Sequence, residues 1–197
     1  VVHEKYKDIG YNHEGRRCGE AHSVECEWKQ WVPTGKSIYN TILRAEVTVG
    51  KHHYITTRPP GVAFILNRQE FICQLACDAE KKGVILQTND KIQSINDLTG
   101  DVLVDASGCP SMVKRELNLR VGYIGKTYQE TLEDANCHFC DTIQIIFSRD
   151  GGYFWIFPRN PEKNEVNIGV GLFGDFGYDL REMLLGFKED QHITGTM

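Results

Sequence analysis

The chain has 197 residues, of which 41% are hydrophobic and 25% charged, and its formal net charge is -5 at pH 7. This is the composition of an ordinary globular protein, and the acidic balance gives no general attraction to nucleic acid or to an anionic membrane. No apolar run approaches the ~20 residues that cross a bilayer. Seven cysteines without the spacing of a secreted disulfide scaffold favour a reducing compartment, so we expect a cytoplasmic protein without a signal peptide.

Two stretches near the N-terminus indicate nucleotide chemistry. Val1 to Glu4 is an apolar strand that ends in an acid, and in a dinucleotide-binding βαβ unit such an acid accepts hydrogen bonds from ribose hydroxyls. The glycine-rich turn of that unit would lie before residue 1, so we expect a fragment. Gly15 to Ala21 reads Gly-Arg-Arg-Cys-Gly-Glu-Ala, a loop whose arginines and backbone amides suit a pyrophosphate. A solvated basic turn explains the same residues equally well.

Short β-type runs follow at Ser37 to Leu43, Glu46 to Val49 and His53 to Thr57. The adjacent histidines 52 and 53 would point to opposite faces of a strand, so no metal site is expected there. Asn67-Arg-Gln-Glu70 opens a predicted helix, which Gly83 stops.

The middle of the chain predicts more strand. Val84 to Leu86 starts one, and Ile92 to Ile95 continues it or pairs with it. Asp101 to Gly108 is predicted as a buried strand that runs into a small-residue turn, with Ser111 capping a helix over 112–119. The CxxC of residues 137–140 lies in a loop without a second cysteine pair, so we expect neither a metal nor a disulfide.

The strongest pattern is a predicted hairpin of Asp141 to Phe147 and Gly151 to Pro158 around an Asp-Gly-Gly turn. Its second strand places Tyr153, Trp155 and Phe157 on one face, as a core wall or as the lining of a flat apolar pocket. Residues 165–173 alternate like a further strand of the same sheet. Leu180, Met183, Leu184 and Phe187 then mark an amphipathic helix.

In this order the pieces resemble the geranylgeranyl reductase family, flavoproteins with the fold of p-hydroxybenzoate hydroxylase. The most specific match is Tyr153-x-Trp155-x-Phe157-Pro158, which is similar to the YxWxFP substrate motif of the family. The loop Arg17-Cys-Gly-Glu20 is the second most specific. Asp105-Ala-Ser-Gly108 is shared with many flavin hydroxylases and halogenases, so it does not distinguish this family from them. The resemblance runs from residue 1 to about residue 190.

The resemblance implies a role for each matched residue. Glu4 would hold the adenosine ribose of FAD, and Arg68 with the backbone of Ile92 would flank the pyrophosphate and the adenine. Tyr153, Trp155 and Phe157 would wall the channel for the isoprenoid chain. Cys18 would be the catalytic side chain, a thiol beside the flavin that donates a proton. The loop along the FAD would consist of Arg17, Cys18, Gly19 and Ala21.

The implied fold is α/β: a partial, Rossmann-like FAD lobe of residues 1–27 and 64–125, and an antiparallel-sheet substrate lobe of residues 28–63 and 126–197. The implied enzyme reduces isolated C=C bonds of geranylgeranyl groups in membrane lipids or in the chlorophyll tail, with FAD as cofactor and ferredoxin or NAD(P)H as electron donor. Peripheral membrane contact would follow from such a substrate. The glycine-rich turn and the C-terminal Gly-Asp-Ala segment of the family are not in the sequence, so we expect this chain alone to be inactive.

Two alternatives stay open. A flavin-dependent aromatic monooxygenase or halogenase of the same fold would have a short, polar pocket behind Trp155, fit for one aromatic ring. A non-catalytic isoprenoid-binding module would have the aromatic slot but no room for a flavin beside Cys18.

Overall fold

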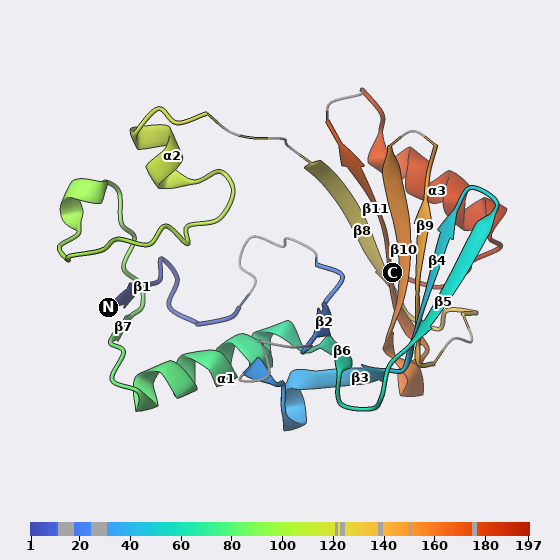
Figure 1. Cartoon of the computed structure of the whole chain (residues 1–197), viewed down its shortest axis with the longest axis horizontal. Helices are drawn as coiled ribbons and strands as arrows, with labels where there is room; N and C mark the ends of the chain where they lie inside the picture. Colours follow the sequence, from blue (N-terminus) through green and yellow to red (C-terminus); the bar gives the residue numbers. More distant parts are fainter. Residues whose placement is uncertain are drawn as a thin grey trace.

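The computed structural model describes residues 1–11, 18–24, 31–120, 122, 125–137, 140–149, 151–174 and 177–197. One side of the molecule is a large twisted sheet covered by a helix, and the other side holds a long helix, a small sheet and mostly irregular chain (Figure 1). The fold class predicted from the sequence, a mixed α/β protein with an antiparallel sheet, is confirmed.

The large sheet has six strands in the order β5-β4-β9-β10-β11-β8. Their bounds are β4 (Arg44–Val49), β5 (His52–Thr57), β8 (Gly125–Leu132), β9 (Thr142–Phe147), β10 (Gly152–Asn160) and β11 (Glu165–Phe173). Neighbours pair antiparallel except β4 and β9, which run parallel. The predicted aromatic hairpin is therefore β9–β10, and the predicted further strand is β11.

The helix α3 (Leu180–Asp190) covers one face of this sheet, as Figure 1 shows. Asp179 caps it by accepting hydrogen bonds from the N–H groups of Arg181 and Glu182. Leu184 is completely buried, and Phe187 stacks on Phe154 of β10 with 4.2 Å between ring centroids. The main core therefore lies between α3 and the β10–β11–β8 side of the sheet.

Gly186 lies inside α3, and a Cβ added there would have no heavy atom within 4 Å. Because glycine in a helix costs roughly 0.5–1 kcal/mol relative to alanine, Gly186→Ala is expected to raise the free energy of unfolding by about that amount. Urea unfolding followed by circular dichroism measures the change. A lower stability than wild type would contradict it.

A smaller sheet has the order β2-β6-β3, formed by β2 (Ala21–Ser23), β3 (Ile38–Ile42) and β6 (Ala63–Leu66). The short helix η2 (Gly35–Ser37) precedes β3, and α1 (Arg68–Lys81) follows β6. Asn67 caps α1, and Gly83 follows its end with φ +88°, so the predicted helix is confirmed. Phe64 and Leu66 of β6 pack against Phe71 of α1 in a second small core.

The remaining elements are short. β1 (Val2–His3) and β7 (Leu86–Gln87) form a two-stranded parallel sheet. The others are η3 (Ile95–Asp97), α2 (Met112–Glu116) and η4 (Pro161–Lys163). Ser111 caps α2 as predicted, but α2 ends at Glu116 rather than at residue 119. Among the described residues, no helix has the length and apolar character to cross a membrane.

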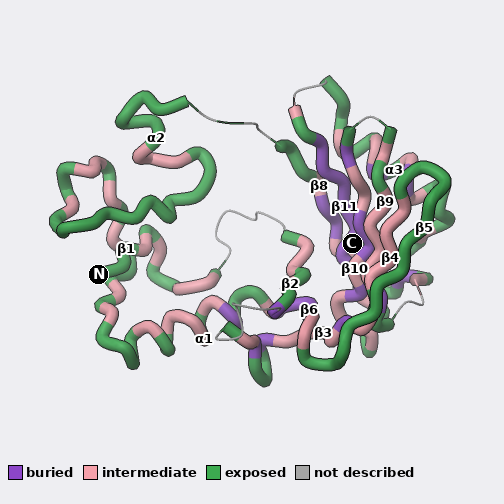
Figure 2. Tube along the Cα trace, in the orientation of Figure 1, coloured by how far each residue is buried: buried purple, intermediate pink, exposed green. Residues whose placement is uncertain are grey.

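The strand predicted over residues 101–108 is wrong, and so is the continuation over 92–95. Val102 and Val104 are 80% and 84% exposed, and Figure 2 shows this segment as exposed. An apolar run becomes a buried strand only where neighbouring strands take up its backbone hydrogen bonds and cover its faces. In the part of the chain that the structure describes, no strand lies beside residues 101–105.

Candidate functional site

A row of aromatic rings lies on the face of the large sheet that points away from α3. Tyr153 and Trp155 are 5.6 Å apart between ring centroids, and Trp155 and Phe157 are 6.3 Å apart. Phe147 of β9 and Phe173 of β11 extend the row beyond Tyr153, at 6.1 and 6.5 Å. Phe154 and Ile156, between these residues on β10, instead pack with the core under α3. The predicted single aromatic face is confirmed.

Two glycines of β11 let these rings lie close over the strand. Gly169 is the cross-strand partner of Trp155, and Gly171 is the partner of Tyr153. A Cβ added at Gly169 would lie 2.2 Å from Cζ2 of Trp155, and one at Gly171 would lie 3.0 Å from Cε1 of Tyr153. Each ring therefore occupies the space that a side chain of β11 would need. The Gly-x-Gly spacing in the sequence is the signal that could have predicted this, because period two places both glycines on the aromatic face.

The aromatic row borders a cavity of about 850 Å³. Ligand-binding pockets in proteins commonly have ~300–1,000 Å³, so its size suits a small lipid or a cofactor portion. Its lining comes from the loop before β2, from β8, from β10 and from the last residue of the chain: Cys18, Gly19, Thr127, Tyr128, Gln129, Glu130, Thr131, Tyr153, Trp155, Phe157 and Met197. The structure thus brings Cys18 and Gly19 together with all three aromatic residues that the sequence singled out.

Backbone of the Cys18–Gly19 loop packs directly on the aromatic row. A Cβ added at Gly19 would lie 2.8 Å from Cε2 of Phe157. The thiol of Cys18 is exposed and accepts a hydrogen bond from the N–H of Glu20 at 3.4 Å. A thiol therefore stands at the wall of an aromatic-lined cavity.

A half-buried polar network ties this loop to the sheet. Arg159 of β10 pairs with Glu20 at 2.8 Å and with Glu165 at 2.5 Å. The side-chain amide of Asn167 donates to the carboxylate of Glu20 at 3.1 Å and to the carbonyl of Gly19 at 3.3 Å. Burial opposes the charge of Arg159, but the hydrogen bond and charge of Glu20, with the charge of Glu165, outweigh it and raise the pKa of the guanidinium.

Sequence reasoning did not find this network. Arg159 directly follows the aromatic motif, and Glu20 directly follows Cys18 and Gly19. Each of these residues stands next to a motif, but nothing local in the sequence shows that two residues 139 positions apart form an ion pair.

Glu4 lies at the carboxyl end of β1, the edge where open parallel sheets bind ligands. Its N–H donates to the carbonyl of Gln87 at 2.8 Å, and its Oε1 accepts from the N–H of Tyr6 at 2.9 Å. Asp90 donates its N–H to the carbonyl of Glu4 at 2.9 Å, which brings the segment of Ile92 beside Glu4. Glu4 and Ile92 are both half-buried.

Arg68 is the first residue of α1 and is exposed, and Ala21 is an exposed residue at the start of β2, where it pairs with Ile65. Arg17 lies outside the described residues. Glu4, Ala21, Arg68 and Ile92 are not among the described residues that line the aromatic cavity. Cys18, Gly19 and the three aromatic residues therefore meet at the cavity, Glu4 and Ile92 lie at the edge of the β1–β7 sheet, and Ala21 and Arg68 lie at neither place.

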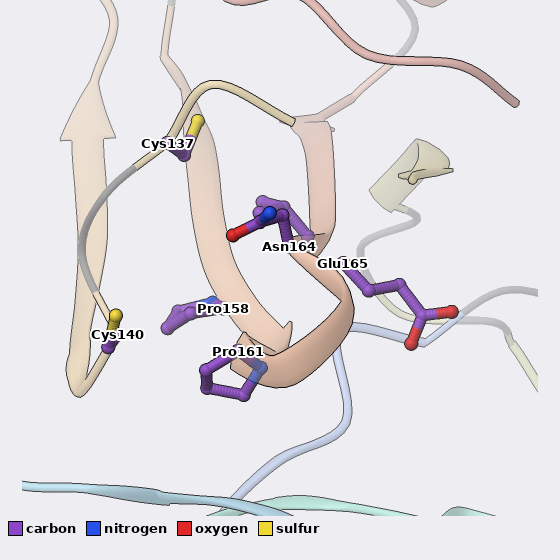
Figure 3. Close-up of a pocket in the computed structure, with 7 residues that line it drawn as sticks. Cys137, Cys140, Pro158, Pro161, Asn164 and Glu165 are labelled. Atoms are coloured by element: carbon purple, nitrogen blue, oxygen red, sulfur yellow. The ribbon is translucent and has the colours of Figure 1, made fainter. Parts of the chain in front are cut away.

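The CxxC lies at a separate, small pocket of about 70 Å³. Figure 3 shows Cys137 and Cys140 on the same side of it, with Pro158 and Pro161 nearby. Neither cysteine forms a disulfide, and burial raises the pKa of the Cys137 thiol. No group of three or more potential metal ligands occurs among the described residues. The pocket is far smaller than the aromatic cavity and does not contain the residues of the aromatic row.

Sequence relatives were found among curated proteins. The chain is 27% identical over 139 residues to digeranylgeranylglycerophospholipid reductase 2 of Methanosphaera stadtmanae, covering 58% of this chain and 35% of the relative. It is 24% identical to digeranylgeranylglycerophospholipid reductase 1 of the same organism, covering 96% of this chain and 52% of the relative. The chain thus spans about half the length, or less, of these relatives. No protein-family model matches it.

Solved structures share the fold. A geranylgeranyl bacteriochlorophyll reductase-like protein from Thermoplasma acidophilum superposes with a TM-score of 0.79 at 19% identity, covering 100% of this chain and 58% of that chain. A flavoprotein/dehydrogenase from Cytophaga hutchinsonii gives a TM-score of 0.50 at 17% identity, covering 71% of this chain and 40% of that chain. The sequence resemblance stated above is confirmed by these relatives and by this fold.

Proposed function

We propose that this chain, a relative of the digeranylgeranylglycerophospholipid reductases, acts in an FAD-dependent reductase that saturates C=C bonds of geranylgeranyl groups in isoprenoid lipids. The observation that carries the proposal is the single cavity shared by the aromatic row and the Cys18–Gly19 loop. A C20 isoprenoid chain is apolar, so it is held by surface contact with aromatic rings rather than by hydrogen bonds. The cavity provides such a surface and places one thiol at its wall.

The residues present are compatible with a flavin dinucleotide. The carboxylate of Glu4 uses Oε1 for the Tyr6 N–H and has a second oxygen, which suits a ribose hydroxyl at the edge of a parallel strand pair. Gly19 has no side chain, which lets its backbone lie directly against the ring of Phe157, and the loop borders the cavity. Glu4 would hold the adenosine ribose, and Arg68 with the backbone of Ile92 would flank the pyrophosphate and the adenine. The loop of Arg17, Cys18, Gly19 and Ala21 would run along the cofactor towards the flavin ring.

When bound, a reduced flavin supplies the hydride for one alkene carbon. The protein's own contribution is to orient the substrate and to exclude water. Tyr153, Trp155 and Phe157 would align the isoprenoid chain in the slot and exclude water from the double bond. The Cys18 thiol would donate the proton to the other alkene carbon. Ferredoxin or NAD(P)H would supply the electrons, and the substrate would bring the enzyme to the membrane surface.

Cys18→Ser tests the proton donor. If the Cys18 thiol is the general acid, turnover should fall about a hundredfold or more while flavin content and lipid binding stay unchanged, because a serine hydroxyl is a much weaker acid. Cys140→Ser, an exposed thiol outside the cavity, is the matched control and should keep full turnover. Full turnover of Cys18→Ser with flavin bound would remove the role of Cys18.

The function itself is tested on the protein expressed from its complete gene. We expect a flavin absorption spectrum that dithionite bleaches and that a geranylgeranyl lipid restores. Restoration only by oxygen, accelerated by a small aromatic compound, would support a monooxygenase. A colourless protein that cannot be reconstituted with FAD would contradict both enzymes and leave an isoprenoid-binding module.

A further inference from the structure

We propose that Glu20 is a positioning residue for the Cys18 thiol. The carboxylate of Glu20 is bound by the large sheet, and its backbone N–H is thereby held at Sγ of Cys18. The inference rests on the function proposed above, in which this thiol donates a proton. It adds that the thiol is oriented by the strands that carry the aromatic row, so that the proton donor and the substrate face keep one fixed arrangement.

The backbone of Glu20 has an uncommon conformation. Its φ is +65°, in the left-handed region that glycine adopts readily and that strains a residue with a side chain. A strained residue of this kind persists only where the surrounding structure holds it, and such residues cluster at functional sites. Contacts of the glutamate must therefore hold this conformation.

Three hydrogen bonds hold Glu20 in place. Oε2 of its carboxylate accepts from Nε of Arg159 at 2.8 Å and from the side-chain amide of Asn167 at 3.1 Å. Its carbonyl accepts from the N–H of Leu66 at 2.9 Å. The side chain of Glu20 is 17% exposed and Asn167 is 1% exposed, so water competes little for these bonds. The residue is thus fixed by β10, β11 and β6 together.

The left-handed turn brings the N–H of Glu20 to the thiol two residues before it. This N–H donates to Sγ of Cys18 at 3.4 Å. The Asn167 amide also donates to the carbonyl of Gly19 at 3.3 Å, which holds the residue between them. Cys18 is exposed, so a hydrogen bond rather than burial fixes the direction of its sulfur.

A backbone N–H at the sulfur suits a proton donor. When the thiol gives its proton to the alkene carbon, negative charge develops on the sulfur, and hydrogen bonds to an ionised acceptor are stronger than those to a neutral one. A donor that is already in place when the charge develops lowers the barrier. Glu20 is not among the described residues that line the cavity, so its effect on the reaction is exerted through Cys18.

A double-mutant cycle on the protein expressed from its complete gene tests this route. Glu20→Ala should lower kcat for a geranylgeranyl lipid about tenfold, the equivalent of ~1.4 kcal/mol, and leave KM and flavin content unchanged. In the Cys18→Ala background the same change should alter the residual kcat less than about twofold, because groups that act as a unit are not additive. Equal losses in the two backgrounds would show a general structural role and overturn the inference.

A second variant separates the backbone of Glu20 from its side chain. Glycine adopts φ +65° without strain, so Glu20→Gly should lose less kcat than Glu20→Ala. Equal losses would contradict a role that is exerted through the left-handed backbone. Glu162→Ala is the matched control, because it removes an exposed glutamate that does not line the cavity, and it should keep the wild-type kcat.

Alkylation of Cys18 tests the same contact without turnover. The thiolate is the reactive form and the N–H of Glu20 stabilises it, so iodoacetamide should modify Cys18 about threefold more slowly in Glu20→Ala than in wild type. Mass spectrometry of the peptides gives the rate, with the exposed Cys140 as internal reference. An unchanged rate would overturn the positioning of the thiol. Slower alkylation in a protein without reductase activity would overturn the proposed function and leave the positioning standing.

Discussion

Gly169→Val is expected to block the slot and to weaken binding of a C20 isoprenoid about tenfold or more. A Cβ at this position would lie 2.2 Å from Cζ2 and 2.5 Å from Cε2 of Trp155, closer than side-chain atoms approach one another. The indole must therefore move away from β11 into the cavity. Forcing extra atoms into a packed site typically costs ~1–3 kcal/mol, and ~1.4 kcal/mol is a factor of ten in affinity.

Two measurements distinguish a loss of binding from a movement of the indole. Binding of a radiolabelled isoprenoid gives its affinity for the aromatic cavity, and the fluorescence emission of the tryptophans reports the environment of the indole. Gly171→Ala is the graded control, because its Cβ would lie 3.0 Å from Tyr153 and a small shift of that ring is enough. Because valine has a high preference for β-strands, a loss of stability in Gly169→Val would not come from its backbone preference. Wild-type affinity of Gly169→Val with an unmoved indole would contradict the prediction.

Leu184→Ala is expected to lower the free energy of unfolding by roughly 3–5 kcal/mol, the upper range for a leucine lost from a core. Leu184 of α3 is 0% exposed and packs in the cluster that contains Ile156, Ile168 and Val170. The truncation leaves a cavity between helix and sheet that rigid strands cannot fill. Urea unfolding measures the loss, provided that the dependence of the free energy of unfolding on urea concentration is the same in variant and wild type.

Its neighbour provides the control. Leu185 is 52% exposed on the same helix, so Leu185→Ala makes the same chemical change without a buried cavity and should cost less than about 1 kcal/mol. Equal losses for the two variants would show that α3 is not held through Leu184.

The sequence predicted the parts of the molecule that depend on local pattern. The period-two alternation around Tyr153 and Trp155 gave the hairpin and its aromatic face, and the spacing of Leu180 to Phe187 gave α3. These signals are local, because alternation and helical periodicity follow from backbone geometry alone.

What the sequence did not predict depends on distant partners. Arg159 and Glu20 form their pair across 139 positions. Residues 101–105 are as apolar as a buried strand, but burial requires neighbours on both sides, and the described chain places none there. Cys18 was assigned to the flavin loop, as a catalytic thiol, through a family resemblance. Its position in the wall of the aromatic cavity needed the structure.

The one parallel pair of the large sheet has a consequence for the order of folding. Pairing of β4 with β9 brings Arg44 next to Thr142, so it closes a loop of nearly half of the chain. The antiparallel contacts among β8, β9, β10 and β11 connect residues much nearer in sequence. Because the entropy of closing a loop rises with its length, these four strands are favoured to assemble first and the β4–β5 hairpin to add afterwards. The aromatic row lies entirely on the strands that assemble early, whereas Cys18 and Gly19 arrive through long-range contacts.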